Sequence, residues 1–170
     1  KPDVFIGIDA PDFNLNIGKV WSLNLGFTRQ KAHLKGSTLQ INETPEYMIQ
    51  GTLNWNSPDQ RFHVSLFPRY QGPEYSTGGP SNKFRHNFGN YFVMNGSIAY
   101  WAGDERQHRF QLRVVNILDE TYAERYGYGN QRFSVAAVQG KLKSTDDAYY
   151  FGYPFEGKPR SVYFSYTTSF

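Results

Sequence analysis

The chain alternates between apolar and polar residues in a series of short segments. Its last ten residues show this most clearly, because Val162, Phe164 and Tyr166 alternate with Ser161 and Ser165. Successive side chains of a strand point to opposite faces, so this pattern predicts a β-strand with one apolar and one polar face. The same alternation, bounded by Gly, Pro, Asn and Asp, predicts six earlier strands. The predicted strands are Val4–Ile8, Val20–Ala32, Tyr47–Trp55, Phe62–Gln71, Phe92–Tyr100, Phe110–Val114 and Ser161–Phe170.

The connections between the predicted strands differ regularly in length. Reading back from the C-terminus they are long, short, long, short, medium and short. They comprise Glu120–Pro159, Gly103–Gln107, Gly72–Phe88, Asn56–Arg61, Lys35–Pro45 and Pro11–Lys19. An outer-membrane barrel has short turns in the periplasm and long loops outside. The pattern therefore predicts an all-β fold, namely a segment of an antiparallel transmembrane β-barrel whose C-terminus is periplasmic.

The longest connection, Glu120–Pro159, shows no clear alternation. A structureless loop of this length would be unusual in a compact domain, but extracellular loops of barrels are often long. Within it, Arg132–Val138 is predicted either to extend a hairpin above the membrane or to fold over the lumen as a lid.

Composition agrees with a barrel. Aromatic residues make up 18% of the chain, with 13 Tyr and 14 Phe, which is more than the core of an ordinary soluble domain needs. No stretch approaches the roughly 20 apolar residues of a membrane helix. The absence of Cys excludes disulfides and thiolate metal sites. The net charge is only +3 and the basic residues are scattered, so we expect no nucleic-acid partner.

The number of predicted strands is odd, whereas bacterial single-chain barrels have an even number. The first predicted strand, Val4–Ile8, runs from the outside towards the periplasm. Either a strand within the chain escapes the pattern, or at least one more strand precedes Lys1, and the shortness of the first strand favours the second explanation. We accordingly expect residues 1–170 to be the C-terminal part of a larger barrel.

Three segments resemble sequences of TonB-dependent outer-membrane receptors. Residues Asn116–Tyr122 resemble the Asn-Leu-Phe-Asp-x-x-Tyr segment near the end of these receptors, with Ile117 and Leu118 in place of Leu and Phe. Residues Gly157–Tyr163 contain the Gly-x-Pro-Arg sequence that leads into the last strand of the family. Residues Asn42–Tyr47 resemble, more loosely, a Pro-containing stretch before an earlier strand. The matches occur in the order that the family has.

The resemblance implies a barrel of about 22 strands closed by an N-terminal plug, of which this chain would supply about the last seven. It also implies location in the bacterial outer membrane and TonB-dependent import of a scarce nutrient, first of all an iron–siderophore complex. The plug and the TonB-contacting segment would precede residue 1. The implied partners are therefore the remaining strands and plug, TonB, the outer-membrane assembly machinery and lipopolysaccharide. No cofactor and no catalytic residue are implied.

Candidate site residues follow from the predicted faces. Arg69 and Arg113 are predicted to face the lumen, where they could contact an anionic substrate or the plug, although a wet lumen needs polar residues in any case. Four tyrosines could stack on a ligand or form the outer aromatic girdle. These are Tyr70, Tyr75, Tyr126 and Tyr128. The ending resembles the C-terminal signature that the assembly machinery reads. Its residues are Phe164, Tyr166 and Phe170.

Two other classes of protein stay open at this point. A small self-contained outer-membrane barrel could carry a lipid-modifying enzyme site near its rim. However, the four histidines lie far apart, and no Gly-x-Ser-x-Gly elbow or paired metal-ligand spacing occurs. A soluble barrel of the lipocalin type also has alternating strands, with its apolar face inside. The confinement of the long connections to one end argues against that alternative.

Overall fold

The computed structural model describes residues 4–34, 43–78, 84–130 and 150–169. Within these ranges the regular structure consists of β-strands, and no helix is present that could span a membrane. The strands are β1 (Val4–Asp9), β2 (Asp12–Ile17), β3 (Trp21–Leu34), β4 (Tyr47–Asn56), β5 (Phe62–Gly78), β6 (Phe84–Ala102), β7 (His108–Val115), β8 (Ala123–Asn130), β9 (Tyr150–Glu156) and β10 (Ser161–Thr168).

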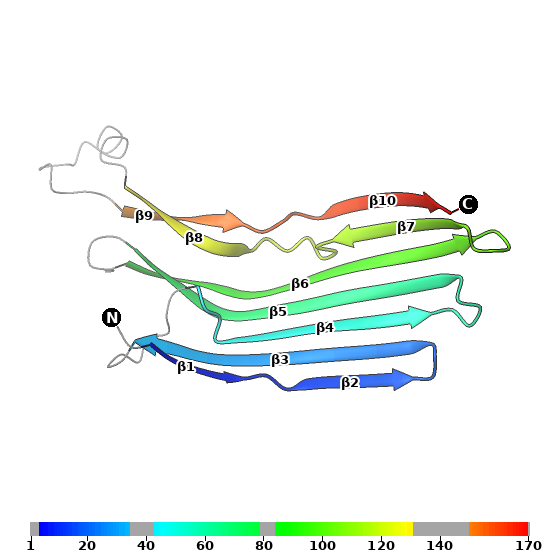
Figure 1. Ribbon diagram of the computed structural model, residues 1–170. Helices are drawn as coiled ribbons and strands as arrows, with labels where there is room; N and C mark the ends of the chain where they lie inside the picture. The colour runs from blue at the N-terminus through cyan, green and yellow to red at the C-terminus, as the bar shows by residue number, and fades with distance from the viewer. Residues whose placement is uncertain (1–3, 35–42, 79–83, 131–149, 170) are drawn as a thin grey trace, which may run out of the picture.

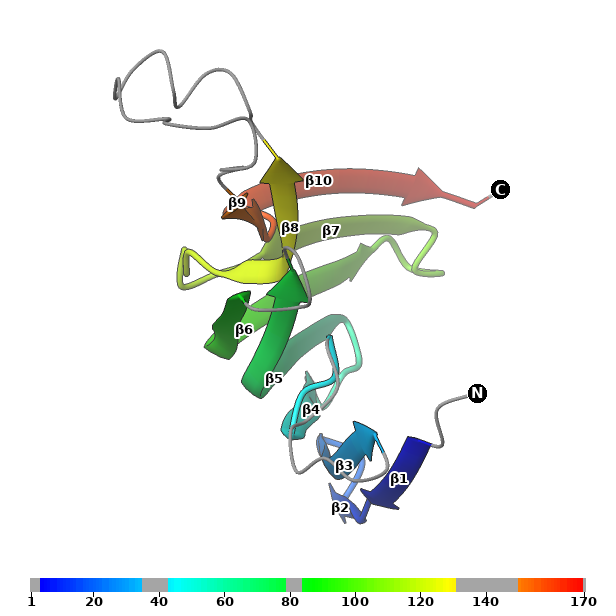
Figure 2. The same cartoon turned by 90° about the vertical axis from the view of Figure 1, so that its left-hand side faces the viewer.

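The main sheet is antiparallel throughout and has the order β1-β3-β4-β5-β6-β7-β10, with β2 also paired to β3. The long strands lie side by side (Figure 1), and the sheet curves into an open arc with β1 and β2 at one edge and β10 at the other (Figure 2). Strands β8 and β9 form a separate two-stranded sheet. The prediction of an all-β antiparallel fold is confirmed.

Strands β1 and β2 form one interrupted strand along the same edge of β3. Pairing runs from Val4 opposite Leu34 to Ile17 opposite Trp21. The interruption is at Pro11, which has no N–H to donate but whose carbonyl oxygen accepts from the N–H of Phe27 at 3.1 Å. The prediction that residues 11–19 form a connection is therefore wrong over β2, and the turn is confined to residues 18–20.

The prediction of a loop at residues 72–88 is also wrong over most of its length, because β5 and β6 continue into this range from its two ends. Pairing extends from Pro73 opposite Gly89 to Gly78 opposite Phe84. The glycines and proline allow a bend here instead of ending the strands. Gly89 has a φ of +84°, and a Cβ on it would lie 2.2 Å from the carbonyl oxygen of Gly72. Only glycine fits this close backbone approach.

The range 120–159, which was predicted to be a loop, contains two paired strands, β8 and β9, at its ends. Strands β8 and β9 pair from Ala123 opposite Glu156 to Asn130 opposite Tyr150. This hairpin extends beyond the adjoining ends of β7 and β10 (Figure 1). The segment Arg132–Val138, for which an extension and a lid were both predicted, lies outside the described residues.

Apolar side chains share one face of the main sheet. Directly opposite residues of neighbouring strands lie on the same face, and the register places Leu23 opposite Leu53, and Leu53 opposite Leu66. Many large side chains of this face are exposed to solvent rather than packed under a second layer. They include Phe13, Leu15, Trp21, Leu25, Phe27, Ile49, Phe62, Phe92, Ile98, Phe110, Leu112, Val162, Phe164 and Tyr166. We call this the apolar face and the opposite one the polar face.

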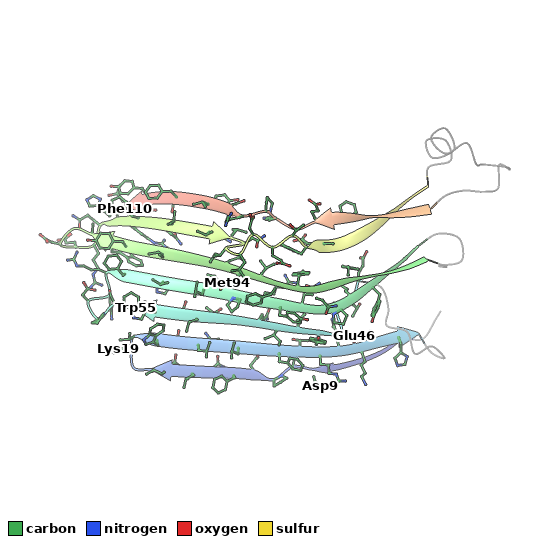
Figure 3. All side chains as sticks on the ribbon, turned by 180° about the vertical axis from the view of Figure 1, so that it is seen from behind. Asp9, Lys19, Glu46, Trp55, Met94 and Phe110 are labelled. Carbon is green, nitrogen blue, oxygen red and sulfur yellow. The ribbon has the colours of Figure 1, made fainter. Side chains whose placement is uncertain are left out.

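Aromatic residues form a row across the apolar face at the end of the sheet that carries the short turns, here named the turn end. Its members are Trp21, Trp55, Phe62, Tyr100, Phe110 and Tyr166, with ring centroids of the contacting pairs 4.5–6.4 Å apart. Trp55 and Phe110 lie near this end, and Glu46 lies towards the opposite, loop end (Figure 3).

A second aromatic contact lies at the loop end, where the rings of Tyr47 and Tyr70 stack with centroids 5.9 Å apart. On β4, Tyr47 and Trp55 are separated by eight residues, which corresponds to roughly 27 Å of strand. Tilting shortens this span to about the height of the apolar band of an outer-membrane barrel. The apolar face therefore has the dimensions of a lipid-facing surface.

Candidate functional site

Near the turn end, the polar face carries a chain of hydrogen bonds. Asn54 Nδ2 donates to Ser22 Oγ at 3.1 Å, and Ser65 Oγ donates to Asn54 Oδ1 at 2.7 Å. His63 Nε2 lies 2.7 Å from Ser65 Oγ, and its Nδ1 lies 2.6 Å from Asn56 Oδ1. Ser65 is buried, and its proton is directed to Asn54. This geometry suits a hydrogen-bonded wall better than a nucleophile and its base, which need an accessible hydroxyl.

The middle of the polar face is hollowed by a cavity of about 570 Å³. Its polar lining consists of the uncharged Asn14, Asn24, Gln50, Thr52 and Asn95 and the charged Asp12 and Arg69, and Phe67 is an exposed aromatic ring within it. Arg69 closes the cavity towards the loop end and also lines a second cavity of about 390 Å³. We call the second one the outer cavity. Its lining comprises Gln30, Pro45, Met48, Arg69, Gln71, Glu74, Tyr91 and Glu124.

A connected group of polar side chains forms one wall of the outer cavity. The guanidinium of Arg69 and the hydroxyl of Tyr91 both donate to Oε1 of Gln71, the latter at 2.9 Å. The amide of Gln71 donates in turn to Glu74. Gln71, Glu74 and Tyr91 are all buried. The ring of Tyr122 packs against that of Tyr91, with centroids 4.4 Å apart. These five residues are the outer polar cluster.

Burial perturbs the acidic groups of Glu74, which lies four residues beyond Tyr70 towards the loop end, and of Tyr122. Loss of hydration raises the pKa of Glu74, and the nearby charge of Glu43 raises it further, whereas the hydrogen bond from Gln71 and the charge of Arg69 oppose the shift. Burial, reinforced by Glu124, also raises the pKa of Tyr122. The phenol therefore stays neutral at physiological pH, and Glu74 holds its proton more readily than an exposed glutamate.

The segment that follows β7 is joined to the segment before β10 by a buried asparagine. Asn116 is 0% exposed. Its Nδ2 donates to the carbonyl oxygens of Glu120 and Lys158 at 2.8 and 3.0 Å, and its Oδ1 accepts from the N–H of Glu120 at 3.0 Å. Its own N–H donates to Asn95 of β6 at 2.8 Å. One residue thus connects three parts of the chain, two through its side chain and β6 through its backbone N–H.

Two further contacts complete this connection. Arg160 forms an ion pair with Asp119 at 3.1 Å. The ring of Tyr122 lies directly over Gly157, where a Cβ would come within 2.0 Å of the ring. We call residues 116–122 together with 157–160 the β7–β10 junction. It unites the two segments whose sequences most resemble TonB-dependent receptors.

The two predicted lumen-facing arginines do not form one site. Arg69 lines both cavities. Arg113 lies opposite Ser97 and Tyr163, and Ser97 is four residues along β6 from Val93, the partner of Arg69. Arg113 lines neither cavity. Its role as a substrate or plug contact stays a prediction.

The predicted ligand-stacking tyrosines with described side chains have partners of their own. Tyr70 stacks on Tyr47 on the apolar face, and its hydroxyl donates to Asn90 at 3.2 Å. This is the geometry of a girdle residue. Tyr75 is farther towards the loop end, and its hydroxyl donates to Glu46 at 3.2 Å. A ligand role for either residue is untested.

The other predicted residues are only partly described. Tyr126 and Tyr128 belong to β8, but their side chains lie outside the described part of the structure. Phe164 and Tyr166 of β10 are exposed on the apolar face, and Phe170 lies outside the described residues. Recognition of these three by an assembly machinery therefore stays a prediction.

Sequence reasoning missed Gln71, Glu74 and Tyr91 as a group. Glu74 fell inside the predicted loop 72–88, so its neighbours could not be inferred. A usable signal was present, because a carboxylate and a glutamine three residues apart flank a Gly-Pro pair that bends a strand without ending it.

The chain resembles solved structures of outer-membrane receptors. The pyoverdine receptor FpvA from Pseudomonas aeruginosa PAO1 has a TM-score of 0.66 at 15% identity, over 95% of this chain and 21% of that one. The ferric-catecholate import receptor Fiu from E. coli K12 has a TM-score of 0.65 at 19% identity, over 96% and 21%. The siderophore receptor PiuA from Acinetobacter baumannii has a TM-score of 0.63 at 14% identity, over 96% and 22%.

The chain thus spans about a fifth of the length of these receptors. Its sequence matches no family model and no curated protein. At these identities the likeness establishes the fold, and it extends over nearly the whole chain. The number of strands in the complete barrel stays a prediction. Residues 1–170 have the fold of a segment of the β-barrel of outer-membrane receptors.

Proposed function

We propose that the chain is the C-terminal part of the barrel of a TonB-dependent receptor in the bacterial outer membrane, and that this receptor imports iron bound to a siderophore. The observation that carries the proposal is the β7–β10 junction. The segments that resemble the family are 41 residues apart at Asn116 and Gly157, yet they contact each other through Asn116, Tyr122 and Arg160. Shared motifs that form one structural unit are stronger support than separate sequence matches.

The two faces fit the two surroundings that this function requires. The apolar face would contact lipid, and the polar face would line the lumen with its two cavities. The edges at β1, β2 and β10 have unpaired backbone groups, which the remaining strands of the barrel would satisfy. A plug and a TonB-contacting segment would be supplied by the preceding part of the receptor.

The outer rim and the last strand suggest further partners. The loop end would face lipopolysaccharide. The exposed aromatic residues of β10, Phe164 and Tyr166, would present the ending to the assembly machinery. The similar solved structures are receptors, and Fiu is an import receptor, which favours a receptor over a lipid-modifying enzyme. The buried Ser65, whose proton is directed to Asn54, supports the same choice.

Transport of radiolabelled iron tests the proposal in cells that make the intact receptor. We expect accumulation of iron from at least one siderophore complex, and we expect accumulation to stop when TonB is deleted or a protonophore is added. Surface binding in the cold should persist in both cases, because binding needs no energy. Iron accumulation that is independent of TonB, or accumulation from no siderophore, would contradict the proposal.

A further inference from the structure

The outer cavity contains a buried carboxylate without a basic partner. Glu74 is 4% exposed and lines the cavity, and the amide of Gln71 holds it in place. Within the described residues, no ion pair joins Glu74 to an arginine, lysine or histidine. A buried carboxylate normally has such a partner, because removal from water disfavours its charge. Its position therefore indicates that the cavity has a place for a cation.

The other charges around the cavity do not supply that cation. Arg69 is the basic residue of the lining, and its guanidinium donates to Gln71 rather than to Glu74. Glu124 lines the same cavity, and Glu43 is close enough to raise the pKa of Glu74. Two carboxylates thus face one arginine within the lining. An anionic ligand would meet net repulsion here, whereas a positively charged group would relieve it.

We propose that the outer cavity binds a positively charged amine of the imported iron complex, through Glu74 and Glu124. This inference rests on the proposed function and specifies its substrate class. An iron(III) tris-catecholate is a trianion, and an iron(III) tris-hydroxamate is neutral. A hydroxamate with a pendant ammonium group is a monocation. The cavity selects the last of these, and Arg69 keeps Gln71 in the orientation that holds Glu74.

The test uses the intact receptor and measures its affinity for three probes. These are a ferric tris-hydroxamate with a free terminal ammonium, its N-acetyl derivative without that charge, and a ferric tris-catecholate. We expect the ammonium form to bind about tenfold more tightly than the acetylated form, as for one close charge pair. The catecholate should bind most weakly.

Three substitutions localise the effect. Glu74→Gln keeps the shape of the side chain and should remove most of the preference for the ammonium form, while affinity for the acetylated form stays within about twofold. Glu124→Gln should reduce the same preference. It gives an independent measurement if the receptor with Glu74→Gln does not assemble. Glu105→Gln makes the same chemical change at an exposed position of the turn end and should leave all affinities unchanged.

The possible failures are distinguishable. Equal losses for both hydroxamates in Glu74→Gln, or an unchanged preference, would overturn the inference alone. The same holds if Glu74→Gln lowers the stability of the receptor without altering its charge selectivity, because the cation would then be a basic side chain of the receptor itself. TonB-dependent uptake that favours the catecholate would also overturn only the inference. A receptor that takes up no iron chelate would overturn both proposals.

Discussion

Gly157 and Asn116 hold the β7–β10 junction by opposite means. Gly157 contributes by lacking a side chain, which lets the ring of Tyr122 lie against the backbone. Asn116 contributes a side chain whose donor and acceptor groups are all used in a fully buried position. A buried amide with these bonds is costly to replace, because truncation leaves backbone groups without partners.

Substitution of Gly157 by alanine should destabilise the receptor by about 2–3 kcal/mol, because the added methyl group displaces a packed ring. Gly18→Ala is the matched control. Gly18 has a φ of +60° and no atoms within 4 Å of an added Cβ, so only backbone strain of about 1 kcal/mol applies. Urea unfolding of the intact receptor in detergent measures both. If Gly157→Ala and Gly18→Ala lower the stability equally, the packing of the Tyr122 ring does not depend on the missing side chain of Gly157.

At the scale of elements, alternation predicted the strands well wherever it was clean. The terminal strand, β3 and β4 were found because each has a run of alternate apolar residues on one face. Strand β2 and the outer parts of β5 and β6 were missed because Pro11 and the Gly72–Pro73 pair are residues that usually end strands. In this sheet the proline carbonyl still accepts a hydrogen bond, and glycine permits a bend. Neither fact is visible before the neighbouring strand is known.

The assignment of faces can be tested with two adjacent residues of β3. Leu25 is on the apolar face near the middle of the band, and Asn24 is on the polar face. In membranes, Leu25→Arg should cost about 2–4 kcal/mol, because it places a charge among lipid chains. Asn24→Arg should cost less than about 1 kcal/mol, because the charge stays in water. Unfolding of the intact receptor in lipid vesicles compares them. If Asn24→Arg destabilises the receptor more than Leu25→Arg does, the assignment of the lipid-facing and water-facing sides is wrong.

At the scale of the whole molecule, the candidate site was less predictable than the fold. The period of its strand places Arg69 on the polar face, where it lines both cavities, and its contact with a substrate or plug stays a prediction. The outer polar cluster, however, combines β5, β6 and the segment leading to β8, which come together only when residues 71, 91 and 122 are brought into contact. Such long-range proximity leaves no local pattern, so the sequence around Glu74 can indicate its contact with Gln71 but not the contacts of this group with Tyr91 and Tyr122.

The size of the native molecule distinguishes a receptor from a small barrel. The chain covers 19–22% of each similar receptor, so the native protein should be about five times the mass of residues 1–170. Electrophoresis of detergent-extracted membranes, with and without heating, should show a heat-modifiable band of that size, because folded barrels resist unfolding by detergent. A heat-modifiable band near the mass of this chain alone would instead indicate a self-contained barrel.

The aromatic row at the turn end also links strand alignment to depth in the bilayer. A slip of one residue between two strands would turn every side chain to the wrong face, which alternation already prevents. A slip of two residues would preserve the faces, yet it would move one strand's aromatic residues by roughly 7 Å along the strand. Trp55 or Phe110 would then leave the level of the lipid headgroups. The membrane would therefore disfavour two-residue slips in strand register, which the hydrogen bonds and faces of the sheet alone would allow.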